Sequence, residues 1–329
     1  MIIAVDAMGG DYAPAEIVKG AVQAASEGAE IALVGPDDLI GAELKKFRYP
    51  PDAITVRHAG EVISMDEHPA IAVRRKKNSS LVVATRLVKD GEAAAVISAG
   101  NTGAQMASAL FAFGRIPGVE RPGIATVFPS PRGPKVLIDS GANVDTRASH
   151  LIQFAYLGSC YARQVLGISN PRVALLSVGS EPTKGTEAVI EAHQVLTAAG
   201  DLRFIGNVEG RDFLTADVDV IACDGFIGNI ALKLTEGIVS TLTGMIRDEL
   251  KRNPLRMLGG LLVKPAFNDL FHRLDYAEYG GAPLLGVQGL SIICHGSSKA
   301  RAIKNAVRFA GKAVQEKLLE SLREGYERR

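Results

Sequence analysis

The sequence predicts an α/β protein in which a large, mixed but mostly parallel sheet is sandwiched by helices. Short apolar runs of strand length alternate along the chain with stretches that have the periodicity of amphipathic helices. The 35 glycines of the 329 residues cluster where the apolar runs end. Glycine-bearing polar loops at strand ends are typical of open α/β sheets that bind ligands there.

The expected elements form a single α/β unit over 1–329, with two intertwined subdomains as the alternative. Strands are expected at 1–5, 29–35, 54–58, 93–98, 123–128, 134–139, 172–178, 202–205, 218–222, 279–287 and 290–294. Helices are expected at 14–25, 62–89, 104–113 and 300–325. A long helix is also expected with apolar positions from Leu151 to Leu166, and another with Asn229 in its first turn that includes Ile238.

Composition excludes several classes of protein. The formal net charge is +1 and no basic, aromatic-interleaved face is present, so we expect no nucleic-acid partner. Cys160, Cys223 and Cys294 lie far apart without metal-ligand spacing, which indicates reduced thiols in the cytoplasm and no structural zinc. No apolar run reaches the 18 or so residues that span a bilayer. Residues 1–5 are predicted to be a strand rather than part of a signal peptide.

The stretch 218–237 is the strongest candidate for a site. A buried strand is followed by a glycine turn and a helix start, where unpaired amide N–H groups and the helix dipole favour an anion. An ordinary βα turn is the alternative. A stripe of Ile230, Leu234 and Ile238 is expected to face the core. The candidate site residues of this stretch are Asp224, Gly225, Gly228, Asn229 and Lys233.

The same arrangement recurs at 6–11, 98–103, 139–145, 177–186 and 294–299. Because ligands of open α/β sheets bind beyond the carboxyl ends of strands, these loops are expected to meet in one cleft. They contribute the candidate substrate-binding residues Asp6, Gly9, Gly10, Gly100, Asn101, Thr102, Gly103, Lys184, His295, Ser297, Ser298 and Lys299.

Each candidate has a plainer interpretation. Asp6 and Asp11 either brace their loop or contact substrate or a metal. Asn101 is either a donor to the ligand or a helix cap. Lys184 either binds phosphate or is solvent-exposed, and the order Lys184-Gly185 excludes a P-loop. His295 is either a proton donor or a structural residue at a cap.

No Ser-His-Asp set, G-x-S-x-G elbow or metal-ligand cluster is apparent, so covalent catalysis by the protein is not expected. The pattern favours a reaction that needs only positioning and charge neutralisation, such as the attack of phosphate on a thioester. We expect no cofactor and no bound metal. The predicted catalytic residues are Asn101, Lys184, Asp224, Asn229, Lys233 and His295.

Residues 254–273 are predicted to form a protruding amphipathic helical segment, which Pro254, Gly259-Gly260 and Pro265 break into two short helices. Basic residues surround its apolar tip, which suits an anionic bilayer or a hydrophobic partner. Burial in a dimer interface is the alternative. The residues predicted to contact the membrane are Met257, Leu258, Leu261 and Leu262.

A second basic feature is the run Arg74-Arg-Lys-Lys77. A solvated helix face explains this run most simply. The alternative is a docking site for an acidic partner.

Six distinctive blocks are spread over the chain, namely 4–11 (AVDAMGGD), 98–104 (SAGNTGA), 223–229 (CDGFIGN), 232–237 (LKLTEG), 279–286 (YGGAPLLG) and 295–298 (HGSS). Together they resemble the signature blocks of the PlsX family of phosphate acyltransferases. The resemblance implies a homodimer with an isocitrate/isopropylmalate dehydrogenase-like, Rossmann-like fold. It also implies conversion of acyl-[acyl-carrier-protein] and inorganic phosphate to acyl phosphate and free acyl carrier protein in bacterial phospholipid synthesis.

The resemblance further implies a cytoplasmic enzyme that associates peripherally with the anionic inner face of the cell membrane. Its product would be the donor for a membrane glycerol-3-phosphate acyltransferase. Two other functions are open. A nicotinamide-dependent dehydrogenase suits the fold but lacks the dinucleotide fingerprint G-x-G-x-x-G after the first strand. A non-enzymatic scaffold would dock at the membrane through its apolar tip.

Overall fold

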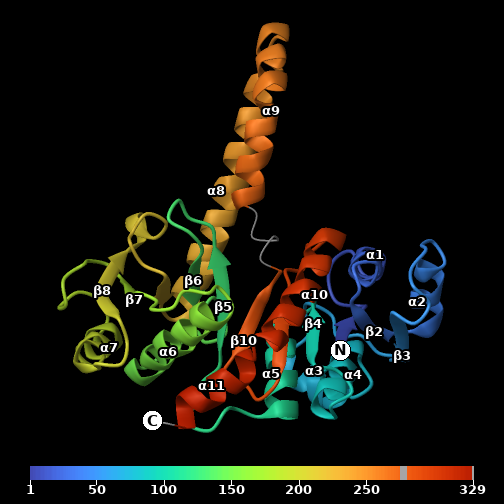
Figure 1. Ribbon diagram of the computed structural model, residues 1–329, viewed down its shortest axis with the longest axis horizontal. Coiled ribbons are helices and arrows are strands. Elements are labelled where there is room, and N and C mark those ends of the chain that lie inside the picture. The colour runs from blue at the N-terminus through green and yellow to red at the C-terminus, as the bar shows by residue number, and fades with distance from the viewer. Residues whose placement is uncertain (275–279, 328–329) are drawn as a thin grey trace.

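A computed structural model describes residues 1–274 and 280–327, except for the side chains of 268–274 and 327. Tyr279, which begins the block YGGAPLLG, lies outside the described residues. An eleven-stranded sheet runs through the described part, with helices on both faces (Figure 1). The strands are β1 (Ile2–Asp6), β2 (Glu30–Gly35), β3 (Ile54–His58), β4 (Ala95–Ser98), β5 (Gly123–Phe128), β6 (Lys135–Ile138), β7 (Val173–Ser177), β8 (Phe204–Glu209), β9 (Val220–Ala222), β10 (Ala282–Leu285) and β11 (Leu290–Ile293).

The helices follow the strands in the alternation that the sequence predicts. They are α1 (Ala15–Ala25), α2 (Asp37–Leu44), α3 (Pro69–Arg75), α4 (Ser80–Lys89), α5 (Thr102–Phe113), α6 (Ala148–Gln164), α7 (Glu187–Ala198), η1 (Gly210–Asp212), α8 (Gly225–Lys251), α9 (Pro254–Leu274), α10 (Ala300–Gln315) and α11 (Leu318–Glu327). The predicted fold class, a mixed and mostly parallel α/β sheet between helices, is confirmed.

Three predicted helix boundaries are wrong. The stretch 62–89 contains two helices, α3 and α4, because the chain turns at 76–79 between them. The last helix is interrupted at Lys317, whose φ of 52° is incompatible with a continuous right-handed helix. Residues 254–274 form one helix with Pro265 inside it, rather than two short helices.

The sheet order is β3-β2-β1-β4-β11-β10-β5-β6-β9-β7-β8. Pairing is parallel in each half and antiparallel only along β11-β10-β5-β6. The two halves therefore run in opposite directions, and a flat sheet would place their carboxyl ends at opposite edges. Because loops from both halves nevertheless line one cavity, described below, the sheet must twist or bend strongly between them.

Alternating strand residues pack against helices on the two faces of the sheet, as expected for a side-chain period of two. Ile3 and Val5 of β1 belong to the largest core cluster, which α1, α6 and α10 cover. Ala4 points to the opposite face and packs with residues of α4. The chain forms β1 to β4 in one half, β5 to β9 in the other, and then returns with β10 and β11.

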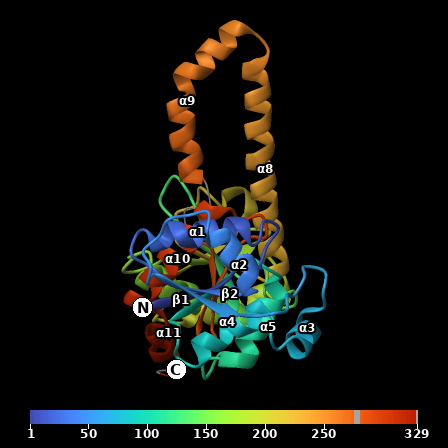
Figure 2. The same cartoon turned by 90° about the vertical axis from the view of Figure 1, so that its right-hand side faces the viewer.

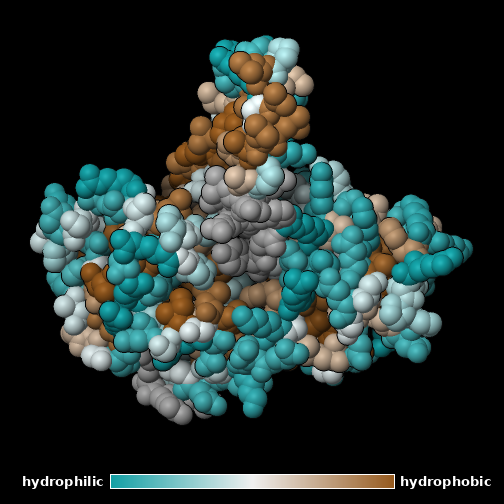
Figure 3. All heavy atoms as spheres, turned by 45° about the horizontal axis from the view of Figure 1, so that its top comes forward, coloured by the Kyte–Doolittle hydropathy of each residue, from teal (hydrophilic) through white to brown (hydrophobic). Residues whose placement is uncertain are grey.

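Helices α8 and α9 project far from the body as a hairpin, and the ribbon bends within α9 (Figure 2). The stripe of Ile230, Leu234 and Ile238 does not face the core as predicted. These side chains are 50%, 60% and 49% exposed, because α8 leaves the body after its first turns. Hydrophobic residues therefore cover much of the projecting hairpin (Figure 3). No helix in the described ranges is long and apolar enough to cross a membrane.

Candidate active site

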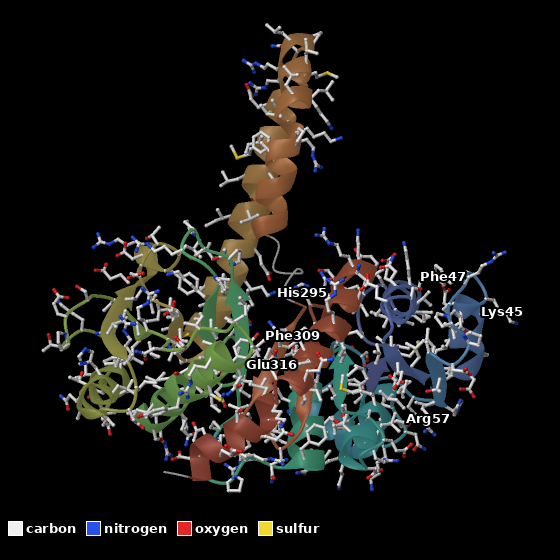
Figure 4. The ribbon with its side chains drawn as sticks, viewed as in Figure 1. Lys45, Phe47, Arg57, His295, Phe309 and Glu316 are labelled. Atoms are coloured by element: carbon white, nitrogen blue, oxygen red, sulfur yellow. The ribbon has the colours of Figure 1, made fainter. Side chains whose placement is uncertain are left out.

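A cavity of about 540 Å³ lies where four strand ends from both halves of the sheet meet. Its walls come from the start of α5 after β4, the loop after β6, the first turns of α8 after β9, and the loop between β11 and α10. His295, which lines it, lies between the two halves and below the projecting hairpin (Figure 4). The predicted meeting of distant loops therefore holds for five of the six, because Asp11 of the loop 6–11 also lines the cavity.

The buried carboxylate of Asp139 organises the loop after β6. It accepts hydrogen bonds from the amides of Ile124, Gly141, Ala142 and Asn143 at 2.7–3.1 Å. The side-chain Nδ2 of Asn143 donates a further hydrogen bond at 2.9 Å. Burial raises the pKa of Asp139, and these N–H donors oppose that rise.

The first turn of α8 packs directly on this loop. A Cβ at Gly228 would lie 1.9 Å from the carbonyl oxygen of Asp139, so only glycine fits there. A Cβ at Gly225 would lie 2.6 Å from the carbonyl oxygen of Asn143. One turn later, Nδ2 of Asn229 donates to the carbonyl of Ser140 at 3.4 Å. The close contact fixes which face of α8 borders the cavity.

That face carries Lys233, whose Nζ lies 2.7 Å from Nε2 of His295 and 3.0 Å from Glu236. An ammonium group can only donate, so Nε2 is the acceptor in this contact. Nδ1 accepts a hydrogen bond from the amide of Ser297 at 3.2 Å and lies 2.7 Å from Oγ of the same residue. Both ring nitrogens thus face a donor, and His295 acts as an acid only when one of them carries a proton that it can release.

The start of α5 forms another wall of the cavity. Gly100, Thr102 and Gly103 line the cavity beside the first, unpaired amides of this helix. Asn101 does not line it. Its Oδ1 accepts from the amide of Ala104 at 3.0 Å as a helix cap, and its Nδ2 donates to the carbonyl of Met65 at 3.0 Å. Both ends of the Asn101 amide are thus used to hold structure.

The loop 6–11 supports the cavity from behind. Asp6 is buried and accepts hydrogen bonds from Oγ of Ser98 at 2.7 Å and from the amide of Met8 at 3.1 Å. A Cβ at Gly9 would lie 2.8 Å from the amide nitrogen of Gly100, so the two loops pack backbone against backbone. Asp6 therefore braces the loop, whereas Asp11 lines the cavity.

The predicted site residues fall into three groups. Those that line the cavity are Gly100, Thr102, Gly103, Asn229, Lys233, His295 and Ser298. Those that hold the wall-forming loops in place by hydrogen bonds or close packing are Asp6, Gly9, Gly10, Asn101, Asp224, Gly225, Gly228 and Ser297. Those that lie elsewhere are Lys184 and Lys299.

The positions of Lys184 and Lys299 explain why neither lines the cavity. Lys184 lies in the same loop as Gly185 and Thr186, which line a separate apolar pocket. Ile230 and Leu234 line that pocket from the opposite face of α8. Within one chain, helix α8 therefore stands between Lys184 and the cavity. The ammonium of Lys299 lies over the ring of Tyr12, 5.6 Å from its centroid, and does not line the cavity.

Sequence reasoning missed Glu236, Met65 and the organising role of the Asp139 carboxylate, although it did predict that the loop 139–145 borders the site. Glu236 lines the cavity and pairs with Lys233 at a spacing of three residues, which helix periodicity could have identified. The role of Asp139 depends on five donors brought together by folding, which no spacing rule reveals. Among the described residues, no group of three or more His, Cys, Asp or Glu side chains could hold a metal ion.

Cys294 lines the cavity next to His295 but is not poised as a nucleophile. Its side chain is 5% exposed, and burial raises the pKa of the thiol to about 12. At pH 7 only about 10⁻⁵ of such a thiol is ionised, and the thiolate is the reactive form. In the described residues the site therefore offers cations, amides and an imidazole rather than an activated thiol.

The fold is similar to that of known phosphotransacylases. A phosphotransacetylase from Streptococcus pyogenes aligns with a TM-score of 0.66 at 18% identity, covering 96% of this chain and 94% of that one. The EutD phosphotransacetylase from Staphylococcus aureus gives 0.60 at 16% identity, covering 95% and 94%. A 4-hydroxythreonine-4-phosphate dehydrogenase from Klebsiella pneumoniae gives 0.52 at 17%, covering 94% and 98%. The fold is thus one that phosphotransacylases share with a dehydrogenase.

Comparison of the sequence with known proteins identifies the family of this chain. The model of the fatty acid synthesis protein family matches residues 1–321. The phosphate acyltransferase of Heliobacterium modesticaldum is 56% identical over 326 residues, covering 98% of this chain and 97% of that one. That of Pelotomaculum thermopropionicum is 53% identical over 328 residues, covering 99% and 95%. The chain belongs to this family, the PlsX phosphate acyltransferases, and is an enzyme, as the resemblance predicts.

Replacing Lys233 with methionine tests whether its ammonium neutralises the phosphate. We expect kcat/KM for phosphate to fall by about 10²–10³, as for removal of one electrostatic contact to a transition state. Lys45→Met is the control, because Lys45 is exposed on the outer rim of the body, away from His295 (Figure 4). Equal kinetics for the two variants would exclude this role for Lys233.

Cys294→Ala should retain kcat within about threefold, since a thiol with a pKa near 12 takes no part as a nucleophile. Steady-state kinetics and mass spectrometry of the enzyme quenched during turnover provide the two measurements. Loss of activity together with an acylated Cys294 in the parent enzyme would contradict direct attack by phosphate.

Proposed function

We propose that this enzyme transfers the acyl group of acyl-[acyl-carrier-protein] to inorganic phosphate, yielding acyl phosphate and free acyl carrier protein. The observation that carries the proposal is a single cavity that combines the Lys233–His295 pair, the α5 N-terminus and apolar walls. The first two suit a phosphate and a developing oxyanion, and the third suits a fatty acyl chain. Membership of the phosphate acyltransferase family supports the same reaction class.

In the proposed reaction, a phosphate oxygen attacks the thioester carbonyl carbon and forms the new C–O bond. The carbon–sulfur bond then breaks, and the sulfur leaves as a thiolate that takes up a proton. Phosphate is already an anionic nucleophile at neutral pH, so no side chain has to remove a proton from it. The enzyme has to hold the two reactants together and stabilise the tetrahedral oxyanion.

Lys233 is proposed to bind the phosphate, with Glu236 and His295 fixing the position of its ammonium group. Amides at the start of α5, near Thr102 and Gly103, together with Asn229, would donate to the oxyanion. When the Lys233 ammonium turns to the phosphate and releases Nε2, this nitrogen can take up a proton, and His295 would then supply that proton to the leaving thiolate. Apolar side chains that could receive the acyl chain line the cavity, namely Met65, Met106, Ile124, Val127, Leu232 and Ile293.

The enzyme is further proposed to form a homodimer. Ile230, Leu234, Ile238 and Leu242 recur every four residues along α8 and are 49–60% exposed. A continuous apolar stripe of this kind is typically covered by another surface, and a second copy of α8 would be self-complementary to it. In such a dimer, Lys184 of one subunit is proposed to bind phosphate in the other subunit's cavity.

The end of the α8–α9 hairpin is proposed to rest on the anionic inner face of the cell membrane. Met257, Leu258, Leu261 and Leu262 are 53–78% exposed there, and Arg252 and Arg256 lie close by in the chain. Apolar residues surrounded by cations bind anionic membranes, because the apolar side chains insert among the lipids and the cations are attracted to the headgroups. This location would deliver acyl phosphate to a membrane glycerol-3-phosphate acyltransferase for phospholipid synthesis.

The proposed reaction is tested by incubating the enzyme with a long-chain acyl carrier protein and inorganic phosphate, then trapping acyl phosphate as its hydroxamate. We expect hydroxamate only when both substrates are present, in amounts equal to the carrier thiol released. Thiol release without hydroxamate would indicate hydrolysis instead. Absence of both products would refute the proposed substrate.

Leu258→Glu tests the membrane contact. A charge in the apolar tip opposes insertion, so we expect partitioning onto vesicles containing phosphatidylglycerol to fall by about tenfold in sedimentation assays. Leu39→Glu is the matched control, because Leu39 is 43% exposed on α2 in the body. Unchanged partitioning of Leu258→Glu, with the thermal midpoint preserved, would rule out this contact.

A further inference from the structure

A second open pocket, of about 710 Å³, lies between α3, α4 and α5 and has an unusual charge. It is lined by Arg74, Lys77, Arg86 and Lys89 together with Phe111 and a single acid, Asp90. The whole chain carries a net charge of only +1, so this pocket is a local concentration of positive charge. We refer to it as the basic pocket.

Its cations are not neutralised from within the molecule. In the part of the chain that the structure describes, none of the four forms an ion pair with a carboxylate. Arg86 donates only to the carbonyl of Lys77, at 3.2 Å. Lys76, from the same basic run, behaves differently, since it turns inward to Glu67 at 2.6 Å. Within the basic run 74–77, Lys76 is therefore paired with a carboxylate, whereas Arg74 and Lys77 have no such partner among the described residues.

Helix dipoles explain why some of these cations are favourable where they lie. Arg74 lies in the last turn of α3, and Arg86 and Lys89 lie in that of α4, where cations are favourable. Lys77 lies beyond α3, and the guanidinium of Arg74 rests over the half-exposed ring of Phe111 at 5.1 Å. An exposed aromatic ring beneath unpaired cations is typical of a docking surface rather than of a helix cap.

The position of the basic pocket excludes the membrane as its occupant once the hairpin rests there. Helices α3 and α4 lie at the end of the body opposite the α8–α9 hairpin (Figures 1 and 2). A flat bilayer cannot meet both ends of the molecule. The occupant that fits is therefore a soluble partner whose surface is acidic, since opposite charge complements these cations.

Helix α5 links the basic pocket to the candidate active site. Thr102, Gly103 and Met106 line the catalytic cavity, whereas Ser108 and Phe111 of the same helix line the basic pocket. Met106 and Phe111 are five residues apart, which is about 7.5 Å along a helix axis. A partner bound at the basic pocket thus lies near enough to reach the cavity with a flexible arm.

We infer that the basic pocket docks an acidic face of the protein that carries the acyl thioester, and steers it toward the cavity. This inference rests on the proposed function, because it takes the donor to be a thioester borne on a carrier protein. Complementary charge raises the rate of encounter and selects the partner, while the chemistry proceeds in the cavity. The pocket therefore governs the KM for the carrier, and leaves kcat unchanged.

The test compares two charge-reversed variants, Arg74→Glu/Lys77→Glu and Arg86→Glu/Lys89→Glu, with the parent enzyme. For acyl carrier protein at low salt we expect KM to rise by about tenfold in each variant, with kcat within twofold. Turnover of acyl-pantetheine, which has the thioester arm but no protein, should stay unchanged. Added salt should raise the parent enzyme's KM and affect the variants less.

The matched control is Lys19→Glu/Lys45→Glu, which reverses two exposed charges on α1 and in the residue after α2, with α1 on the opposite face of the sheet from α4. It should retain the parent KM. An unchanged carrier KM in the pocket variants, or an equal loss with acyl-pantetheine, would overturn the docking site. Loss of phosphatidylglycerol-vesicle binding in those variants, with an unchanged carrier KM, would overturn it in favour of lipid.

Direct binding separates this inference from the reaction itself. Calorimetry with acyl carrier protein that lacks an acyl group should show binding to the parent enzyme and at least tenfold weaker binding to both pocket variants. Binding with this pattern but no acyl phosphate formation would support docking and refute the proposed reaction. Acyl phosphate formation from acyl-pantetheine without any carrier binding would refute docking alone.

Discussion

The site depends above all on the buried carboxylate of Asp139. Its five N–H donors fix the loop after β6, and that loop is the surface against which Gly225 and Gly228 seat the first turn of α8. Asn229, Lys233 and Glu236 border the cavity because α8 starts there in one orientation. A charge held by so many donors in the interior is costly to disturb, since removing one partner leaves the others unpaired.

The fold was largely predictable from sequence, because buried strands ending in polar glycine loops are a strong local signal. The site was only partly predictable. Lys233 and His295 were identified from helix and loop position, and the structure brings them within 2.7 Å. Asn101 and Asp224 were assigned chemistry, yet each caps the helix that follows it. A cap and a ligand donor have the same local sequence, and only tertiary contacts distinguish them.

Other differences between the expected and the observed arrangement have a common physical origin in tertiary geometry. The apolar stripe of α8 was expected to be buried, since periodicity reveals that a face is apolar but not what covers it. The Lys184 loop follows a strand as the other loops do, but α8 lies between it and the cavity. The reversal of strand direction between the halves of the sheet was also invisible in the sequence, because it depends on which strands pair.

Helix α8 runs without interruption from the cavity to the hairpin end. Eighteen residues separate Lys233 from Lys251, which corresponds to about 27 Å of helix. An enzyme resting on lipid through its hairpin would hold its reaction chamber at that height above the headgroups. The newly formed acyl phosphate, a mixed anhydride with an apolar acyl chain, would then have to move along the apolar side of the hairpin or diffuse through water. In that arrangement, the length of this one helix would set how far a reactive product travels before the bilayer can receive it.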